Sequence, residues 1–187
     1  MKYLITLPWM PYPATDGGKQ GSFNMLMELQ NMIDITLIYP VFFKKQMACQ
    51  YLLEKQLPKV KVYPFEYYKN KDGIKSQYSL FRLHRIITRK FLKQPYLATP
   101  IYKDAYIDFV NEIIKKERID IVQNEYFEQL YMVYAIPNTV KKVFIQHEIQ
   151  YIAKERLIQQ REYPSSVRYL ATMQRIQEIN ALNEYDQ

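Results

Sequence analysis

The sequence predicts an α/β fold: one open, parallel, Rossmann-like sheet with helices on both faces. Short apolar runs rich in β-branched residues alternate with longer segments whose apolar residues recur at helical spacing. The chain opens on a strand, a glycine-rich segment, a helix and a second strand, which is one βαβ unit and implies parallel strands with a right-handed crossover. Three predicted strands end in polar clusters, as strands do beside a ligand site in such sheets.

The first predicted strand spans residues 2–7, which are mostly apolar and β-branched. Residues 8–16 hold three prolines and predict a loop. Gly17, Gly18 and Gly21 follow, and they are three of only four glycines in 187 residues. A chain so poor in glycine is expected to need these three for backbone reasons.

Apolar residues at roughly helical spacing predict a helix from Ser22, a suitable N-cap. Residues 33–39 predict a second buried strand that stops at Pro40. The remaining predicted elements are a helix over 41–57, strands over 60–63, 119–123 and 142–145, a loop over 66–76, helices over 77–93, 101–118 and 126–135, and a mostly helical segment over 151–185 that is interrupted near Pro164.

The composition excludes several classes of protein. The single cysteine, Cys49, rules out an internal disulfide and therefore a disulfide-stapled secreted scaffold. One cysteine and two histidines cannot supply four ligands to a Cys/His zinc site, so no metal is expected. No apolar run approaches the ~18 residues of a membrane span, and the apolar run at the N-terminus is too short for a secretory signal. The expected compartment is the cytosol.

The net charge of +7 comes from one region. Residues 44–103 carry fourteen Lys or Arg and three acidic residues, and the rest of the chain is mildly acidic. A basic region favours phosphate-bearing partners, and its alternative interpretation is an ordinary solvated surface. Within it, one predicted helix aligns four basic residues beside an apolar stripe, as in helices that lie on anionic membranes. These four residues are Arg82, Arg85, Arg89 and Lys93. The alternative is a helix that packs its apolar stripe on its own domain and turns its arginines outward.

The carboxyl ends of the predicted strands indicate where a ligand would bind. The segment Gly17-Gly18-Lys19-Gln20-Gly21 would present amide N–H groups to an anion at a helix N-terminus. This segment lacks the Gly-Lys-Ser/Thr ending of a P-loop and the glycine spacing of a dinucleotide-binding fingerprint. The alternative interpretation is a tight turn that binds no ligand.

Two further strand ends carry polar residues. The segment Gln123-Asn124-Glu125 ends the fourth predicted strand, and Gln146-His147-Glu148 follows the fifth, so both segments are expected at the site. His147-Glu148 is not a zincin motif, because Tyr151 stands where the second histidine would be. We expect Gly17, Glu125 and His147 to converge on one edge of the sheet. The alternative interpretations are that His147 has only a structural role and that Glu125 stabilises the dipole at the N-terminus of the helix that follows it.

Taken together, these motifs resemble the N-terminal domain of a GT-B glycosyltransferase. The resemblance rests on the strand that leads into a proline-rich loop and Gly17-Gly18, on Asp120-Ile121-Val122-Gln123 with Glu125, and on the strand that ends in His147-Glu148. The tail Glu184-Tyr185-Asp186 is similar to the helix end that precedes the next strand in that family. The family is the large retaining family 4, which builds bacterial lipopolysaccharide, capsule and other glycans.

The resemblance implies that residues 1–187 form the acceptor-side Rossmann-like domain and that a donor-binding C-terminal domain lies outside this chain. It implies a metal-independent enzyme with no bound cofactor that uses a UDP- or GDP-type nucleotide sugar and a glycan or lipid-linked acceptor. It places Gly17, Gly18, Lys19, Gly21, Glu125 and Glu148 near donor phosphates and acceptor, and His147 near the reacting sugar. The expected location is the cytoplasm, at the inner face of the plasma membrane, and this chain alone is expected to be inactive.

Two other classes of function stay open at this point. Basic charge and 18 tyrosines suit nucleic-acid binding, although no nucleic-acid motif is present and the tyrosines are spread along the chain, so no nucleic-acid partner is expected. A non-catalytic α/β interaction domain is the third interpretation.

Overall fold

The computed structural model describes residues 1–69, 104–147, 149–160 and 162–186. It confirms the α/β class, with five parallel strands in the order β3-β2-β1-β4-β5. The strands are β1 (Lys2–Thr6), β2 (Asp34–Val41), β3 (Lys61–Glu66), β4 (Ile121–Glu125) and β5 (Lys141–Ile145). The α-helices are α1 (Gly17–Leu29), α2 (Gln50–Gln56), α4 (Asp104–Glu117), α5 (Gln150–Gln159) and α6 (Ser165–Asn183). Three 3₁₀ helices, η1 (Lys44–Cys49), η2 (Tyr67–Lys69) and η3 (Phe127–Tyr134), complete the described elements.

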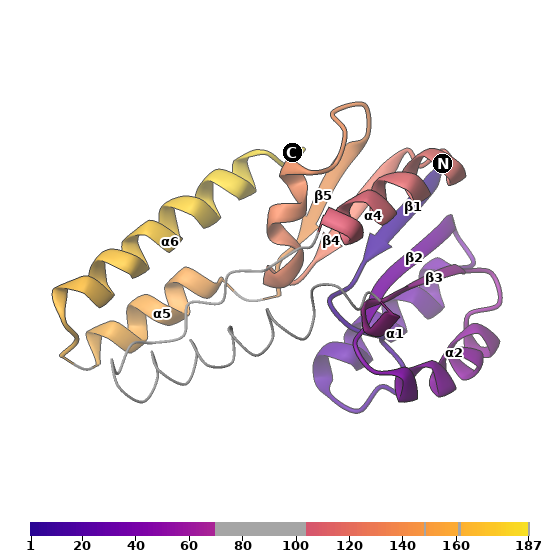
Figure 1. Ribbon diagram of the computed structural model, residues 1–187, viewed down its shortest axis with the longest axis horizontal. Coiled ribbons are helices and arrows are strands. Elements are labelled where there is room, and N and C mark those ends of the chain that lie inside the picture. The colour runs from indigo at the N-terminus through magenta and orange to yellow at the C-terminus, as the bar shows by residue number, and fades with distance from the viewer. Residues whose placement is uncertain (70–103, 148, 161, 187) are drawn as a thin grey trace.

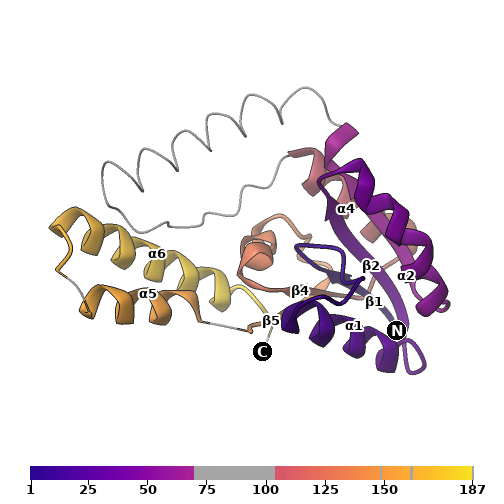
Figure 2. The same cartoon turned by 90° about the horizontal axis from the view of Figure 1, so that it is seen from below.

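Successive side chains of a strand point to opposite faces of the sheet, so neighbouring residues of one strand pack in two different cores. Leu4 packs in a core with Val110 and Ile114 of α4. Ile5, the next residue of β1, packs with Leu26 of α1 and Leu53 of α2. Both faces of the sheet are therefore covered by helices, and Figure 2 shows α1 and α4 on opposite sides of the strands.

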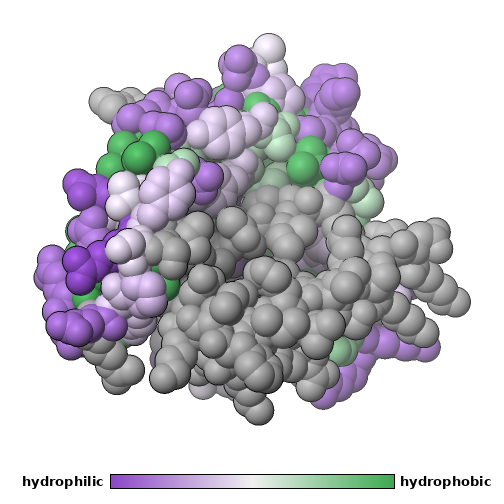
Figure 3. All heavy atoms as spheres, turned by 60° about the vertical axis from the view of Figure 1, so that its left-hand side comes forward, coloured by the Kyte–Doolittle hydropathy of each residue, from purple (hydrophilic) through white to green (hydrophobic). Residues whose placement is uncertain are grey.

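The helices α5 and α6 run side by side and extend away from the sheet (Figures 1 and 2). The C-terminal end of α6 is attached to the sheet through a third core, in which Ala181 of the helix and Tyr185, two residues after its end, pack with Leu130 of η3. None of the helices that the structure describes is long and apolar enough to cross a lipid bilayer. In the view of Figure 3, hydrophobic residues among the coloured part of the surface form small separate areas between hydrophilic ones.

The prediction that Pro40 stops the second strand is wrong, because β2 continues through Pro40 to Val41. The amide of Leu7 donates to the carbonyl of Ile38, so the backbone polar groups of Ile38 point towards β1. Because these groups alternate in direction along a strand, the backbone nitrogen of Pro40 also points to that side, where β1 has already ended. Its missing N–H therefore removes no ladder hydrogen bond, and β2 keeps its pairing with β3 up to Val41.

The prediction that the glycines form a loop before a helix capped by Ser22 is also wrong. The helix α1 begins at Gly17 and includes all three glycines, none of which has a positive φ angle. Asp16 is the N-cap, since its Oδ1 accepts the amide of Lys19 at 2.9 Å. This cap and the burial of Leu26 against the sheet outweigh the low helix propensity of glycine.

The other predicted elements differ from the structure mainly in their limits. The predicted helix over 41–57 is divided between η1 and α2, and the predicted helix over 126–135 is the 3₁₀ helix η3. The third strand reaches Glu66, so η2 occupies the start of the predicted loop. The predicted helix over 77–93 and its basic stripe lie outside the described residues.

Candidate functional site

The site lies where the winding of the sheet reverses. After β1 the chain adds β2 and β3 on one side, and it then crosses to add β4 and β5 on the other. The carboxyl ends of β1 and β4 are adjacent there, and the hydroxyl of Thr6 donates to Oδ1 of Asn124 at 2.6 Å. A switch point of this kind is where open α/β sheets bind ligands.

Glu125, the last residue of β4, is the buried centre of the site. Its side chain is 1% exposed, whereas that of His147 is 38% exposed. Its Oε1 accepts a hydrogen bond of 2.7 Å from Nε2 of Gln123, and its Oε2 lies 3.3 Å from Nε2 of His147. The hydroxyl of Ser22 donates to the same Oε2 at 3.3 Å. These polar partners make up for the loss of water around the carboxylate.

Tyr126 joins the N-terminus of α1 to His147. Its ring stacks on the imidazole of His147, with centroids 3.9 Å apart and planes at 13°. Its hydroxyl donates to the carbonyl of Gly18 at 2.8 Å and lies 3.2 Å from the hydroxyl of Ser22. Burial raises the pKa of the Tyr126 phenol, which stays a neutral donor at ordinary pH. The backbone of Tyr126 has φ 66°, a strained conformation for a residue with a side chain and one that often occurs at functional sites.

The N-terminus of α1 differs from the expected anion cradle. The carboxylate of Asp16 already occupies the amide of Lys19, and this backbone hydrogen bond holds the pKa of Asp16 below its usual value. The ammonium group of Lys19 lies 3.3 Å from Oδ2 of Asp16. A phosphate at this helix end would therefore share it with a carboxylate, which weakens the case for a phosphate site formed by the glycines alone.

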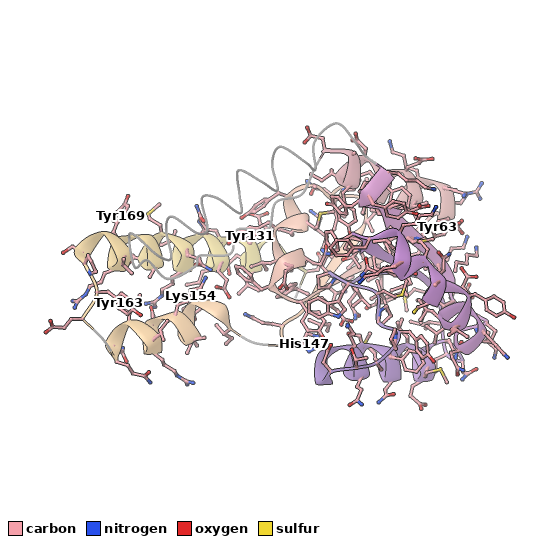
Figure 4. The ribbon with its side chains drawn as sticks, turned by 60° about the horizontal axis from the view of Figure 1, so that its bottom comes forward. Tyr63, Tyr131, His147, Lys154, Tyr163 and Tyr169 are labelled. Atoms are coloured by element: carbon pink, nitrogen blue, oxygen red, sulfur yellow. The ribbon has the colours of Figure 1, made fainter. Side chains whose placement is uncertain are left out.

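The loop that carries His147 is fixed from its other side by α6. Glu178, which is fully buried, accepts hydrogen bonds from Nε2 of Gln146 at 3.2 Å and from the amide of Tyr151 at 3.0 Å. Nearby on α5, burial lowers the pKa of Lys154 to about 8. Figure 4 shows His147 where α5 and α6 meet the sheet, near one end of α1, with Lys154 further out on α5.

The structure brings together three of the predicted site residues. Gly18, Glu125 and His147 are connected through Tyr126, although more than 100 residues separate the first from the second. Gly17 and Lys19 flank Gly18 in the first turn of α1, and Gly21 lies exposed at the next turn. Glu148 and the stripe of Arg82, Arg85, Arg89 and Lys93 fall on residues outside the described ranges.

Sequence reasoning missed Ser22 and Tyr126 as site residues, whereas it expected Gln123 there as part of the segment Gln123-Asn124-Glu125. Ser22 lies four residues after Gly18 and four before the buried Leu26, so a helix that started at Gly17 would have placed it on the covered face. Gln123 lies two residues before Glu125 on the same strand, so the two side chains share one face of the sheet. Nothing in the sequence indicates that Tyr126 stacks on His147.

The arrangement suits proton transfer or hydrogen bonding to a ligand better than metal binding. A half-exposed imidazole is held against a buried carboxylate, which is how proteins orient histidines that act as acids, bases or hydrogen-bond partners. In the part of the chain that the structure covers, no three His, Cys, Asp or Glu side chains form a group that could hold a metal ion.

Comparisons with protein-family models, with curated proteins and with solved structures found no match for this chain.

Proposed function

We propose that this chain is the N-terminal, acceptor-side domain of a glycosyltransferase that moves a sugar from a nucleotide sugar to a glycan or lipid-linked acceptor. The process would be the synthesis of bacterial surface polysaccharide or lipopolysaccharide. One observation carries the proposal: His147, oriented by Glu125, lies at the switch point of a parallel sheet beside the first turn of α1. The order of motifs along the chain, which resembles the GT-B family, is consistent with it.

The chemistry of sugar transfer makes two demands, and this site suits one of them. An acceptor hydroxyl must be held and oriented, which a half-exposed imidazole at the edge of the sheet can do. The leaving diphosphate must also be stabilised, for which helix N-termini and basic side chains suffice without a metal. Because Asp16 occupies the end of α1, we assign most of that second task to a donor-binding C-terminal domain of the same protein.

The proposal includes a location. A lipid-linked acceptor lies in a membrane, so the enzyme would work in the cytoplasm at the inner face of the plasma membrane. Arg82, Arg85, Arg89 and Lys93 would attach it reversibly to anionic lipid.

The test is transferase activity of the protein expressed from its complete gene. It would be incubated with UDP-glucose, UDP-galactose, UDP-N-acetylglucosamine or GDP-mannose together with octyl β-glucoside as hydroxyl acceptor, and release of the nucleoside diphosphate would be measured. We expect turnover of one of these donors and a decrease of at least tenfold for His147→Ala, since the imidazole would no longer contact the sugar or the acceptor.

The matched control is Tyr51→Ala, which removes an exposed ring from α2 and should leave turnover unchanged. Thermal unfolding of both variants would show whether the fold is intact. Absence of turnover with every donor, or full activity of His147→Ala, would refute the proposal.

A further inference from the structure

On the basis of the proposed function, we infer that Tyr126 is a positioning residue for sugar transfer. Its ring fixes the plane of the His147 imidazole, and its hydroxyl ties that ring to the first turn of α1. Tyr126 acts through His147 and not on the sugar itself. The role adds to the site a residue that neither the sequence motifs nor the resemblance to a family indicated.

Two contacts hold the imidazole of His147, and they restrain it in different ways. Its Nε2 lies 3.3 Å from Oε2 of Glu125, a contact that fixes one atom of the ring and leaves the plane of the ring free to turn. The ring of Tyr126 stacks on the imidazole with centroids 3.9 Å apart and planes at 13°, which fixes the plane. The side chain of His147 is half-exposed, so its orientation depends on these two contacts together.

Tyr126 is itself held from several sides. The ring of Trp9 packs on it with centroids 4.6 Å apart. Its hydroxyl donates to the carbonyl of Gly18 at 2.8 Å, and its amide donates to the carbonyl of Ile145 at the end of β5 at 3.3 Å. The tyrosine ring is therefore a fixed support, and the imidazole that stacks on it takes its position from α1, β4 and β5 at once.

The backbone of Tyr126 points to a functional reason for its side chain. Its φ of 66° and ψ of 154° fall in a region that is essentially restricted to glycine. A glycine would adopt this conformation without strain, but it would leave the imidazole of His147 without support. Residues that keep a side chain in such a conformation cluster at active sites and ligand clamps.

Loss of the ring should lower the rate of transfer more than the affinity for the donor. An imidazole whose plane turns freely spends less time in the orientation that contacts the sugar or the acceptor, and a small misplacement of this kind can cost about a hundredfold in rate. The proposed function assigns most of the donor diphosphate to a C-terminal domain. KM for the nucleotide sugar should therefore change little.

The first experiment measures kcat and KM for the protein expressed from its complete gene, with octyl β-glucoside as acceptor. Tyr126→Leu should lower kcat about tenfold or more, while KM for the nucleotide sugar changes by less than about twofold. Tyr126→Phe keeps the ring and loses only the contacts of the hydroxyl, so it should recover most of the activity that Tyr126→Leu loses.

The matched control is Phe65→Leu, which also replaces an aromatic ring by leucine. Phe65 is buried, and its ring contacts those of Tyr67, Tyr106 and Phe109 in a core that excludes the site residues. This variant should lose stability and keep the kcat of the wild type. Thermal unfolding would establish that each variant is folded.

The second experiment reads the stacking directly and needs no turnover. In protein labelled with carbon-13 histidine, the imidazole C–H resonances of His147 are identified by their absence in His147→Gln. A stacked aromatic ring should shift them upfield of their position in 6 M guanidinium. This upfield shift should persist in Tyr126→Phe and Phe65→Leu and disappear in Tyr126→Leu.

The outcomes separate the two proposals. Wild-type kcat in Tyr126→Leu, an equal loss of kcat in Tyr126→Phe, or His147 resonances that stay upfield in Tyr126→Leu would overturn the positioning role and leave the glycosyltransferase function in place. Absence of turnover in the wild type with every donor would overturn the proposed function, and the role of Tyr126 in sugar transfer with it.

Discussion

Gly18 differs from the other glycines of α1 in what surrounds it. A Cβ atom added at Gly18 would lie 3.2 Å from the hydroxyl oxygen of Tyr126, whereas nothing lies within 4 Å of one added at Gly17 or Gly21. Tyr126 cannot easily give way, because its ring stacks on His147 and its hydroxyl bonds to the Gly18 carbonyl. Of the three glycines, Gly18 is therefore the one that the site needs.

A pair of alanine substitutions tests this difference. Gly21→Ala should stabilise the protein by about 0.5–1 kcal/mol, because alanine favours the helix and restricts the unfolded chain. Gly18→Ala should gain less than Gly21→Ala or lose stability, and it should reduce transferase activity by displacing Tyr126. Urea unfolding gives the free energies. Equal stabilisation by both substitutions, with activity unchanged, would show that Tyr126 accommodates the methyl group.

At the scale of one residue, the sequence identified the chemistry but not the contacts. Glu125 and His147 could be selected because each follows a predicted strand, and strand ends meet at one edge of a parallel sheet. Their distance, and the stacking of Tyr126 between α1 and His147, depend on side-chain rotamers that no local pattern encodes. The role of Ser22 was misassigned because Asp16 caps the helix six residues earlier.

The helix α4 ends in a Schellman motif without glycine. The amide of Ile119 bonds to the carbonyl of Ile114, and the amide of Arg118 bonds to that of Lys115. Arg118 has φ 55°, the left-handed conformation that usually requires glycine. Ile114 and Ile119 are both buried in the same core, which is the hydrophobic contact that accompanies the motif.

Replacing this residue should stabilise the end of the helix. Arg118→Gly removes the Cβ that makes the left-handed conformation unfavourable, and we expect a gain of about 1 kcal/mol. Arg118 is exposed, so little packing is lost. The control is Lys115→Gly inside the last turn, which should destabilise by about 1 kcal/mol. Guanidinium unfolding distinguishes them, and a loss of stability for Arg118→Gly would contradict this account.

At the scale of elements, periodicity located most helices and strands, and tertiary contacts set their ends. The stripe of apolar residues in α4 is evident in the sequence and is buried in the structure. The extension of β2 through Pro40 depends on where β1 ends, which is a property of the neighbouring strand. Element limits of this kind follow from pairing and cannot be derived from one segment alone.

The whole molecule is expected to unfold in alkali. Burial raises the pKa of Tyr131 to about 12 and raises those of Tyr39, Tyr106 and Tyr185 further. Above pH 10 the unfolded chain loses these protons while the folded chain keeps them, so stability that is complete below pH 10 decreases as the pH rises.

Absorbance at 295 nm would follow the ionisation of the tyrosines, and circular dichroism would follow the fold. A free tyrosine ionises near pH 10. The buried tyrosines should ionise at higher pH, together with loss of the circular dichroism signal. In 6 M guanidinium all of them should titrate near pH 10. Ionisation of all tyrosines near pH 10 in a folded protein would contradict the burial of these four.

The sequence alone determined the fold class, because alternation of strand-like and helical segments leaves a parallel sheet as the way to bury both faces of each strand. It also determined which edge of the sheet would carry the polar residues. The order of the strands and the residue at which α1 begins were decided only by the tertiary structure. The same is true of the contact between Glu125 at the end of β4 and His147 after β5. The reason is physical: strand-end positions follow from local pattern, whereas distances between side chains 22 residues apart depend on register, crossover and packing of the whole sheet.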